Sequence, residues 1–135
     1  MKEELVFSLR VICGDWMVIG QVEDGELRVI PITGGTFTGK INGTIVPGGA
    51  DWNTQKNEFV SYAAAKYVIR TEDGCYISVE NEGEIDDRKP GPFQTKPVFQ
   101  VDKTSKYSWL NDGEFIGKLT CGEVDGEVRI DVFQV

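Results

Sequence analysis

The chemistry open to this 135-residue chain is limited first by a residue that it lacks, because it contains no histidine. Without an imidazole, a Ser-His-Asp or Cys-His nucleophile, a His-ligated zinc ion and a His-held haem are all excluded. Cys13, Cys75 and Cys121 lie far apart and form no C-x-x-C motif, which argues against a cysteine-built metal or thioredoxin-type site. We expect reduced, mostly buried thiols, no structural metal and no cofactor.

One string matches most of a phosphate-binding loop. Residues 34–40, GGTFTGK, fill the first part of the motif, but Ile41 stands where a Ser or Thr would hold magnesium. A turn and a strand pattern follow, whereas the motif requires a helix whose N-terminal amides bind phosphate. We interpret the string as a chance match.

An acid and an indole, Asp51 and Trp52, follow the Pro-Gly-Gly turn at residues 47–49. In a functional interpretation, Asp51 lines the mouth of a cavity as acid, base or hydrogen-bond acceptor, and Trp52 forms an apolar wall. In a structural interpretation, Asp51 caps backbone amides and Trp52 fills the core. The sequence alone leaves both interpretations open.

A second aromatic cluster, YSWLN, spans residues 107–111. Its two rings could close one end of a barrel or bind a ligand, and Asn111 could begin the turn at Asp112-Gly113. In the segment around residues 55–69, a strand would place Lys66 and Arg70 on one face and Tyr67 on the other. Inward cations would suit an anionic or carbonyl-bearing ligand, but we favour solvated, outward ones.

If a cavity is functional, its polar groups are expected to converge at one mouth from the turn, the strand and the aromatic cluster, with the two indoles as walls. The candidate ligand-binding residues are Asp51, Trp52, Arg70, Tyr107, Trp109 and Asn111, with Asp51 as the candidate catalytic residue.

Acidic residues gather between positions 80 and 87, but they lack the fixed spacing and turn glycine of a calcium loop. We interpret them as a solvated edge. Residues 83–97 contain three prolines, Pro90, Pro92 and Pro97, and predict a loop that could act as a lid.

The elements that must position these residues are short strands separated by tight turns. Four Asp-Gly pairs and one Asn-Gly pair, which favour two-residue hairpin turns, separate segments rich in Val, Ile, Phe, Tyr and Thr. Residues 5–13 and 127–132 alternate between apolar and polar side chains, as half-buried strands do. Residues 55–69 fit a strand or, through Ala63–Ala65, a helix, and we favour a strand. The pattern predicts an all-β antiparallel sandwich or barrel in a single domain, residues 1–135.

The charge balance restricts the partners. Fourteen Lys and Arg against 22 Asp and Glu give a formal net charge of −8, which argues against nucleic acids and anionic membranes. Glu3 and Glu4 stand where a signal peptide carries basic residues, and no stretch approaches the roughly 20 apolar residues of a membrane-spanning helix. These features predict a cytoplasmic protein.

Four strings in a fixed order carry a resemblance to a known family: residues 30–37 (IPITGGTF), 47–52 (PGGADW), 69–74 (IRTEDG) and 107–111 (YSWLN). Together they resemble the domain-of-unknown-function-3237 family of small bacterial and fungal proteins, over Leu5 to Val135. The resemblance implies an eight-stranded antiparallel β-barrel, lipocalin-like in shape, and a strand at residues 55–69. It implies almost nothing about activity.

Three hypotheses for function follow. The one we favour is a binding module that holds a small organic molecule in a barrel cavity. The second is a His-free isomerase, cyclase or lyase that uses Asp51 with a Tyr or Arg. The third is a structural or interaction protein with a packed barrel, and a homo-oligomer is compatible with each hypothesis.

Overall fold

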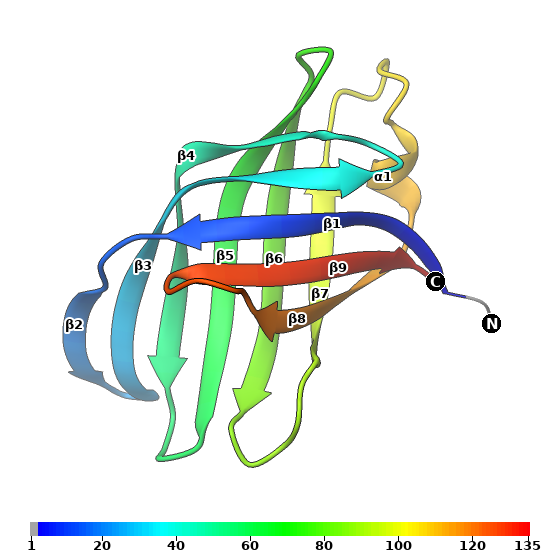
Figure 1. Ribbon diagram of the computed structural model, residues 1–135. Coiled ribbons are helices and arrows are strands. Elements are labelled where there is room, and N and C mark those ends of the chain that lie inside the picture. Colours follow the sequence, from blue (N-terminus) through cyan, green and yellow to red (C-terminus); the bar gives the residue numbers. More distant parts are fainter. Residues whose placement is uncertain (1–2) are drawn as a thin grey trace.

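The computed structural model describes residues 3–135, and most of them lie in strands (Figure 1). The strands are β1 (Glu4–Cys13), β2 (Met17–Val22), β3 (Gly25–Gly39), β4 (Gly43–Gln55), β5 (Val60–Thr71), β6 (Tyr76–Asp86), β7 (Phe93–Gln100), β8 (Phe115–Cys121) and β9 (Glu127–Gln134). One four-residue helix, α1 (Trp109–Asp112), lies between β7 and β8. The expected all-β class is confirmed, and residues 55–69 contain strand, not helix. Within residues 3–135 no helix is long and apolar enough to cross a membrane.

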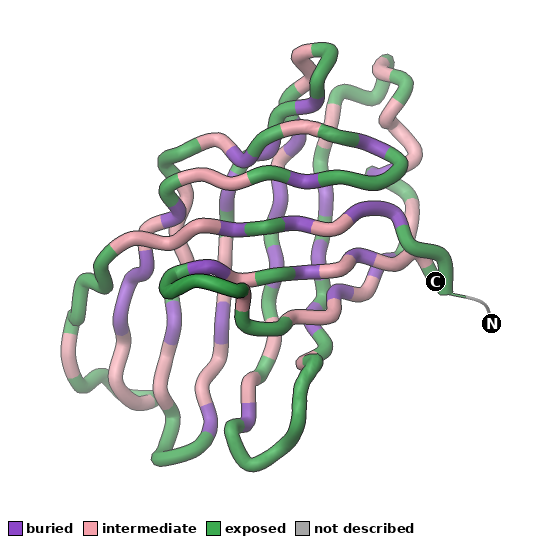
Figure 2. Tube along the Cα trace, viewed as in Figure 1, coloured by how far each residue is buried: buried purple, intermediate pink, exposed green. Residues whose placement is uncertain are grey.

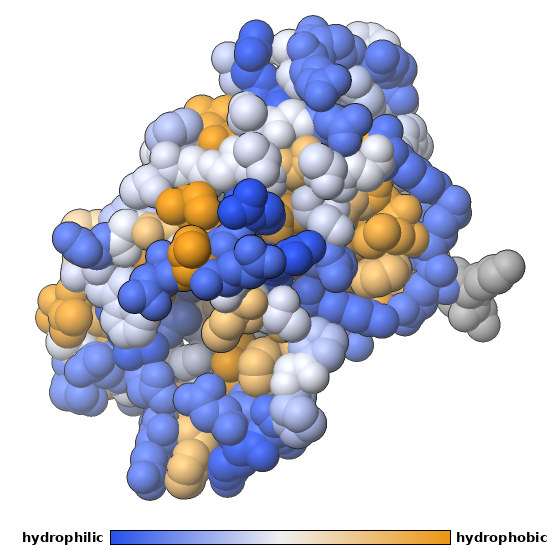
Figure 3. Space-filling model, viewed as in Figure 1, coloured by the Kyte–Doolittle hydropathy of each residue, from blue (hydrophilic) through white to orange (hydrophobic). Residues whose placement is uncertain are grey.

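Eight antiparallel strands close into a barrel because the long strand β3 pairs with different neighbours along its length. Its second half pairs with β1, from Phe7 opposite Gly39 to Cys13 opposite Ile32, whereas its first half pairs with β2. The remaining strands follow in the order β4 to β9, and β9 pairs with β1. Strand β2 therefore extends the sheet beyond the closed barrel, and its apolar side chains gather at the left edge of Figure 3.

All but the last residue of the GGTFTGK string lies in β3, near the point where the pairing of this strand with β4 is irregular. Gly35 has a φ of 138°, and a Cβ there would collide with the carbonyl oxygen of Arg10 on β1. Gly35 and Gly39, which meets Val6 and Phe7 of β1 in the same way, therefore serve the close approach of two strands. The backbone around them is extended and does not open a helix.

The chain turns between β3 and β4 at residues 40–42, next to the Asn-Gly pair that predicts a hairpin. One predicted boundary is corrected. The loop expected over residues 83–97 is confined to residues 87–92, because β6 continues to Asp86 and β7 begins at Phe93. The acidic residues Glu80 and Glu82 alternate with the buried Val79 and Asn81, so they lie on the solvent face of β6 (Figure 2).

One end of the barrel is filled by aromatic side chains. Phe7 packs edge-to-face against Phe37 and Phe99, and Phe99 against Phe115, with ring centroids 5.2–5.6 Å apart. Leu110 of α1 is buried against this cluster. We call it the α1 end. At the other end the β4–β5 and β6–β7 hairpins extend past β8 and β9 (Figure 1).

Candidate functional site

A cavity of about 50 Å³ lies inside the barrel. Every strand of the closed barrel contributes to its wall, which consists of Val11, Cys13, Ile32, Asp51, Ala63, Ala65, Tyr67, Asn81, Thr95, Leu119, Val128 and Ile130. Most of these side chains are apolar. The polar groups among them are therefore the features that could fix a bound molecule's orientation.

Alternation along β5 creates the space. Ala63, Ala65 and Tyr67 point inward, whereas Lys66 between them is exposed. The two methyl side chains leave room that larger residues would fill. Inward-pointing residues lie opposite one another on neighbouring strands: Asp51 lies opposite Ala65, and Ala65 lies opposite Asn81.

Three buried polar atoms belong to residues that line this cavity, one on each of three adjacent strands. The Tyr67 hydroxyl on β5, the Asn81 Oδ1 on β6 and the Thr95 Oγ1 on β7 have no hydrogen-bond partner within residues 3–135. The three residues are only 3%, 4% and 4% exposed. A buried polar atom without a partner costs roughly 1–3 kcal/mol, and such atoms are rare in native proteins. All three of these atoms belong to residues that line one cavity.

Glycines on neighbouring strands make room for two of these side chains. A Cβ at Gly49 would collide with the Cβ of Tyr67, and one at Gly117 would collide with the Oγ1 of Thr95. A Cβ at Gly83 would lie 2.8 Å from the Cγ2 of Thr95. Close backbone packing therefore holds Thr95 on both sides and Tyr67 on the β4 side.

Asp51 is the ionisable carboxyl of the cavity. Its Oδ1 accepts a hydrogen bond from the Ala64 N–H at 2.8 Å, and its Oδ2 accepts one from the Asn53 Nδ2 at 3.3 Å. Burial raises the pKa of Asp51, and these two hydrogen bonds and the charge of Arg28 offset part of that rise. A carboxyl whose pKa is moved toward neutrality can exchange a proton with a bound molecule.

The cation nearest in the polar network, Arg28, is turned away from the cavity. Its guanidinium donates to the Asn53 Oδ1 at 2.7 and 3.0 Å and to the Gln55 Oε1 at 2.9 Å, and it stacks on the Trp16 ring at 4.6 Å. A polar chain thus runs from Asp51 toward the end of the barrel opposite α1.

The other two titratable groups stay protonated at neutral pH. Burial raises the pKa of the Tyr67 phenol above its usual range, with a smaller contribution from Cys13. Burial also raises the pKa of the Cys13 thiol, and the charge of Asp51 adds to this rise. The phenol is therefore a hydrogen-bond donor, and the thiol is a poor nucleophile.

The structure offers no metal centre at this site: in the described part of the chain, no group of three or more His, Cys, Asp or Glu side chains could hold a metal ion. The cysteines differ from expectation. Cys13 and Cys75 are half-buried and Cys121 is exposed, so the prediction of mostly buried thiols was wrong, although all three are free.

Of the predicted site residues, Asp51 lies in the cavity, but its neighbour Trp52 does not. Adjacent residues of a strand point to opposite faces, so Trp52 projects outward and is 51% exposed. It borders a shallow outer depression together with Pro47 and Val68.

The other four predicted residues lie toward the α1 end, so the expected convergence on Asp51 is corrected. Arg70 is exposed on β5. It lies five residues, or about 16 Å along the strand, beyond Ala65, which is the residue opposite Asp51. The Tyr107 hydroxyl donates to Asp73 at 2.8 Å, outside the cavity. The Asn111 side chain bonds the Val101 backbone in both directions, each at 2.8 Å. Trp109 packs on Phe115.

The preferred orientation of the two cations on β5 is confirmed. Lys66 and Arg70 are both exposed, and Lys66 pairs with Glu80 at 3.2 Å. Sequence reasoning missed Cys13, Asn81 and Thr95 as cavity residues. The signal that could have found Asn81 is its position in the strand, since it shares the apolar face of β6 with Val79 and Ile77.

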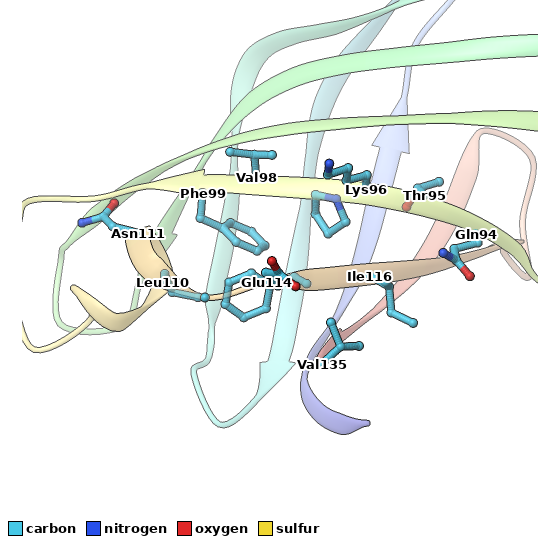
Figure 4. Close-up of a pocket in the computed structure, with 13 residues that line it drawn as sticks. Gln94, Thr95, Lys96, Val98, Phe99, Leu110, Asn111, Glu114, Ile116 and Val135 are labelled. Carbon is cyan, nitrogen blue, oxygen red and sulfur yellow. The ribbon is translucent and has the colours of Figure 1, made fainter. Parts of the chain in front are cut away.

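A second hollow lies on the outside of the barrel, where β7 and β8 separate. They pair only over Phe93–Thr95 and Gly117–Leu119. Beyond this point they enclose a groove of about 450 Å³, bordered by Phe99, Leu110, Glu114, Ile116 and Val135 (Figure 4). This groove reaches Asn111 but none of the cavity's polar residues other than Thr95.

Comparison with known proteins places the chain among bacterial proteins of unknown function. It is 34% identical over 151 residues to the UPF0311 protein blr7842 of Bradyrhizobium diazoefficiens, covering 100% of this chain and 97% of the relative. The solved structure of RPA1785, a conserved protein of unknown function from Rhodopseudomonas palustris, matches with a TM-score of 0.87 and 30% identity over 98% of this chain and 96% of that one.

A more distant solved structure, described as an enzyme from Penicillium herquei, has a TM-score of 0.77 and 24% identity over 98% of this chain and 92% of that one. At this identity it shows the shared fold alone. The resemblance carried by the four sequence strings is confirmed over the whole length: the sequence model of the family described as "Protein of unknown function (DUF3237)" matches residues 1–135, and the chain belongs to this family.

Proposed function

We propose that this protein binds a small organic molecule inside the barrel. The observation that carries the proposal is the set of unpartnered polar atoms on Tyr67, Asn81 and Thr95, each on a residue more than nine-tenths buried. In a barrel that only packs its own side chains, apolar residues at these positions would be less costly. The set therefore favours a ligand site over a purely structural interior.

The size and exposure of the wall suggest how a ligand would lie. A drug-sized ligand needs a pocket of roughly 300 Å³ or more, so the cavity of about 50 Å³ accepts only one end of such a molecule. Cys13, Leu119 and Val128 are half-buried and border the cavity, so the rest of the molecule would extend past them toward solvent.

A second candidate function, acid–base catalysis, is favoured by Asp51. Its carboxyl borders the same cavity as the protonated Tyr67, and burial raises its pKa toward the range in which a carboxyl can act as an acid and a base. This arrangement would suit an isomerase, cyclase or lyase that needs no metal. Sharing a fold with a fungal enzyme adds no argument about the reaction.

Native mass spectrometry of the purified protein tests the proposal, with two matched variants. Ala65→Leu fills the cavity, whereas Ala64→Leu places the same side chain on the outer face of β5. We expect excess mass on the wild type and on Ala64→Leu, and its loss from Ala65→Leu. A wild-type protein of bare mass, combined with a fragment screen in which no compound shifts the Asn81 and Thr95 amide resonances, would contradict the proposal.

A further inference from the structure

We infer that the ligand of this cavity is uncharged and presents an O–H or N–H donor to Tyr67, Asn81 and Thr95. This inference rests on the proposed function and adds the chemical class of the molecule. It follows from which hydrogen-bonding capacities are unfilled, and from which charges border the space.

The unfilled capacities require a donor. An amide oxygen such as the Asn81 Oδ1 can only accept, whereas the hydroxyls of Tyr67 and Thr95 can donate or accept. A ligand carbonyl or ether would leave the Asn81 oxygen unpaired, and a hydrocarbon would leave all three atoms unpaired. A hydroxyl or an amide N–H satisfies the amide oxygen, and a hydroxyl can also accept from one of the two side-chain hydroxyls.

The charges around the cavity exclude an anion. No Lys or Arg is present among the described residues that line it, and Asp51 supplies a carboxyl. Arg28 directs its guanidinium to Asn53 and Gln55 instead. A carboxylate or phosphate would lose its hydration without gaining a cation, which costs several kcal/mol in a protein interior.

The cavity also offers a bound cation no free carboxylate oxygen. Both oxygens of Asp51 already accept hydrogen bonds, one from the Ala64 backbone and one from Asn53. The three unpartnered atoms belong to neutral side chains, and the rest of the wall is apolar, including Val11, Ile32 and Ile130. A neutral polar group on an apolar body matches both halves of this surface.

Four probes that share one frame separate these chemistries: benzyl alcohol, toluene, benzoate and benzylamine. They are titrated into the ¹⁵N-labelled protein, and the shifts of the Asn81, Thr95 and Ala65 amides report occupancy of the cavity. We expect benzyl alcohol to bind at least about tenfold more tightly than each of the other three, because only it pairs the buried polar atoms without bringing a charge.

Two tyrosine variants locate the effect. Tyr67→Phe removes a hydroxyl inside the cavity, and Tyr107→Phe removes one that bonds Asp73 outside it. We expect the preference of benzyl alcohol over toluene to fall severalfold in Tyr67→Phe and to stay unchanged in Tyr107→Phe. Asn81→Leu, which replaces the amide by an apolar side chain of similar size, should also lower the preference severalfold, because it removes the acceptor that requires a donor.

The outcomes distinguish the inference from the function on which it rests. Equal binding of toluene and benzyl alcohol at the cavity would overturn the inference and leave the proposed function standing. Tightest binding of benzoate or benzylamine would do the same. Failure of all four probes to shift cavity amides, with ordered water alone bridging the three polar atoms in a crystal soaked with benzyl alcohol, would overturn both.

Discussion

Three residues that line the cavity lower the stability of the ligand-free fold. The interior of a barrel is most stable when it is apolar and filled, yet Tyr67, Asn81 and Thr95 each bring a polar atom that the folded chain leaves without a partner. Binding sites commonly carry this kind of cost, because a group that waits for a ligand cannot also be satisfied by the protein. The cost can be measured by removing one such group.

Tyr67→Phe is expected to raise the melting temperature of the ligand-free protein. The substitution keeps the ring and removes an unpartnered buried hydroxyl, which should stabilise the fold by about 1 kcal/mol. Tyr107→Phe is the control and should lower the melting temperature, because it removes a hydrogen bond to Asp73. Hydrogen bonds from Thr71 and from Tyr107 lower the pKa of Asp73 to about 2. Differential scanning calorimetry compares the three proteins. A clear loss of stability in Tyr67→Phe would mean that its hydroxyl has a structural partner.

The Asp51 carboxyl predicts a pH-dependent difference between the wild type and Asp51→Asn. Because folding raises the pKa of Asp51, the folded protein binds more protons than the unfolded chain between the ordinary and the raised value, and stability falls as pH rises through that window. The asparagine variant lacks this loss. Its melting temperature relative to wild type should therefore increase from pH 4 upward and level off above the raised pKa. A difference that stays flat from pH 4 to 8 would contradict a raised pKa.

At this scale the sequence predicted one cavity residue and missed most of the others. Asp51 could be found because a Pro-Gly-Gly turn delivers it beside an aromatic residue. Asn81 and Thr95 look like ordinary strand residues, and only the pairing of β5, β6 and β7 brings them to one space. Trp52 and Arg70 attract attention by their chemistry, but alternation along β4 and β5 turns both outward. The face of the sheet toward which a side chain points depends on strand register, and amino-acid composition does not reveal the register.

At the scale of elements, close packing between strands holds the cavity's side chains in place. Thr95 on β7 lies opposite Gly117 on β8, and a Cβ at that glycine would collide with the threonine Oγ1. This contact occurs within the short segment over which β7 and β8 pair. The same segment separates the inner cavity from the outer groove, since Thr95 borders both.

Gly117→Ala is expected to destabilise the protein by about 1–3 kcal/mol, as overpacking of a filled interior does. Thr95→Ala removes the atom with which the new methyl group would collide, so the double variant should recover most of the loss. Urea denaturation of the wild type, both single variants and the double variant gives the coupling energy. Additive effects of the two substitutions would show that the glycine is required for another reason.

The elements themselves were largely predictable. Asp-Gly and Asn-Gly pairs mark hairpin turns, and a period of two in β1 and β9 marks strands with one buried face. What local patterns could not supply were long-range features. The extension of β6 to Asp86, the separation of β7 from β8, and the position of β2 outside the closed barrel all depend on pairing between distant segments.

At the scale of the whole molecule, closure joins the two ends of the chain. Strand β1 lies between β9 and β3, with Leu9 opposite both Ile130 and Phe37. The barrel is therefore incomplete until the last strand is in place, and the cavity wall needs residues from β1 and β9 as much as from the central strands. This topology predicts that the site and the fold are lost together.

Unfolding is accordingly expected to be a single cooperative transition at all points of the barrel. The three tryptophans report on different regions: Trp16 stacks on Arg28 beyond the cavity, Trp52 lies on the outer face of β4, and Trp109 packs in the α1 end.

Variants that retain one tryptophan each, with phenylalanine at the other two positions, are unfolded in urea and followed by fluorescence and by far-ultraviolet circular dichroism. The midpoints from each fluorescence signal and from dichroism should coincide within each variant. The slope should lie in the range of about 1–3 kcal/mol per molar urea that small single domains show. If Trp109 changed at lower urea than the dichroism signal, the α1 end would open while the strands remain paired, and closure would not couple the two ends of the barrel.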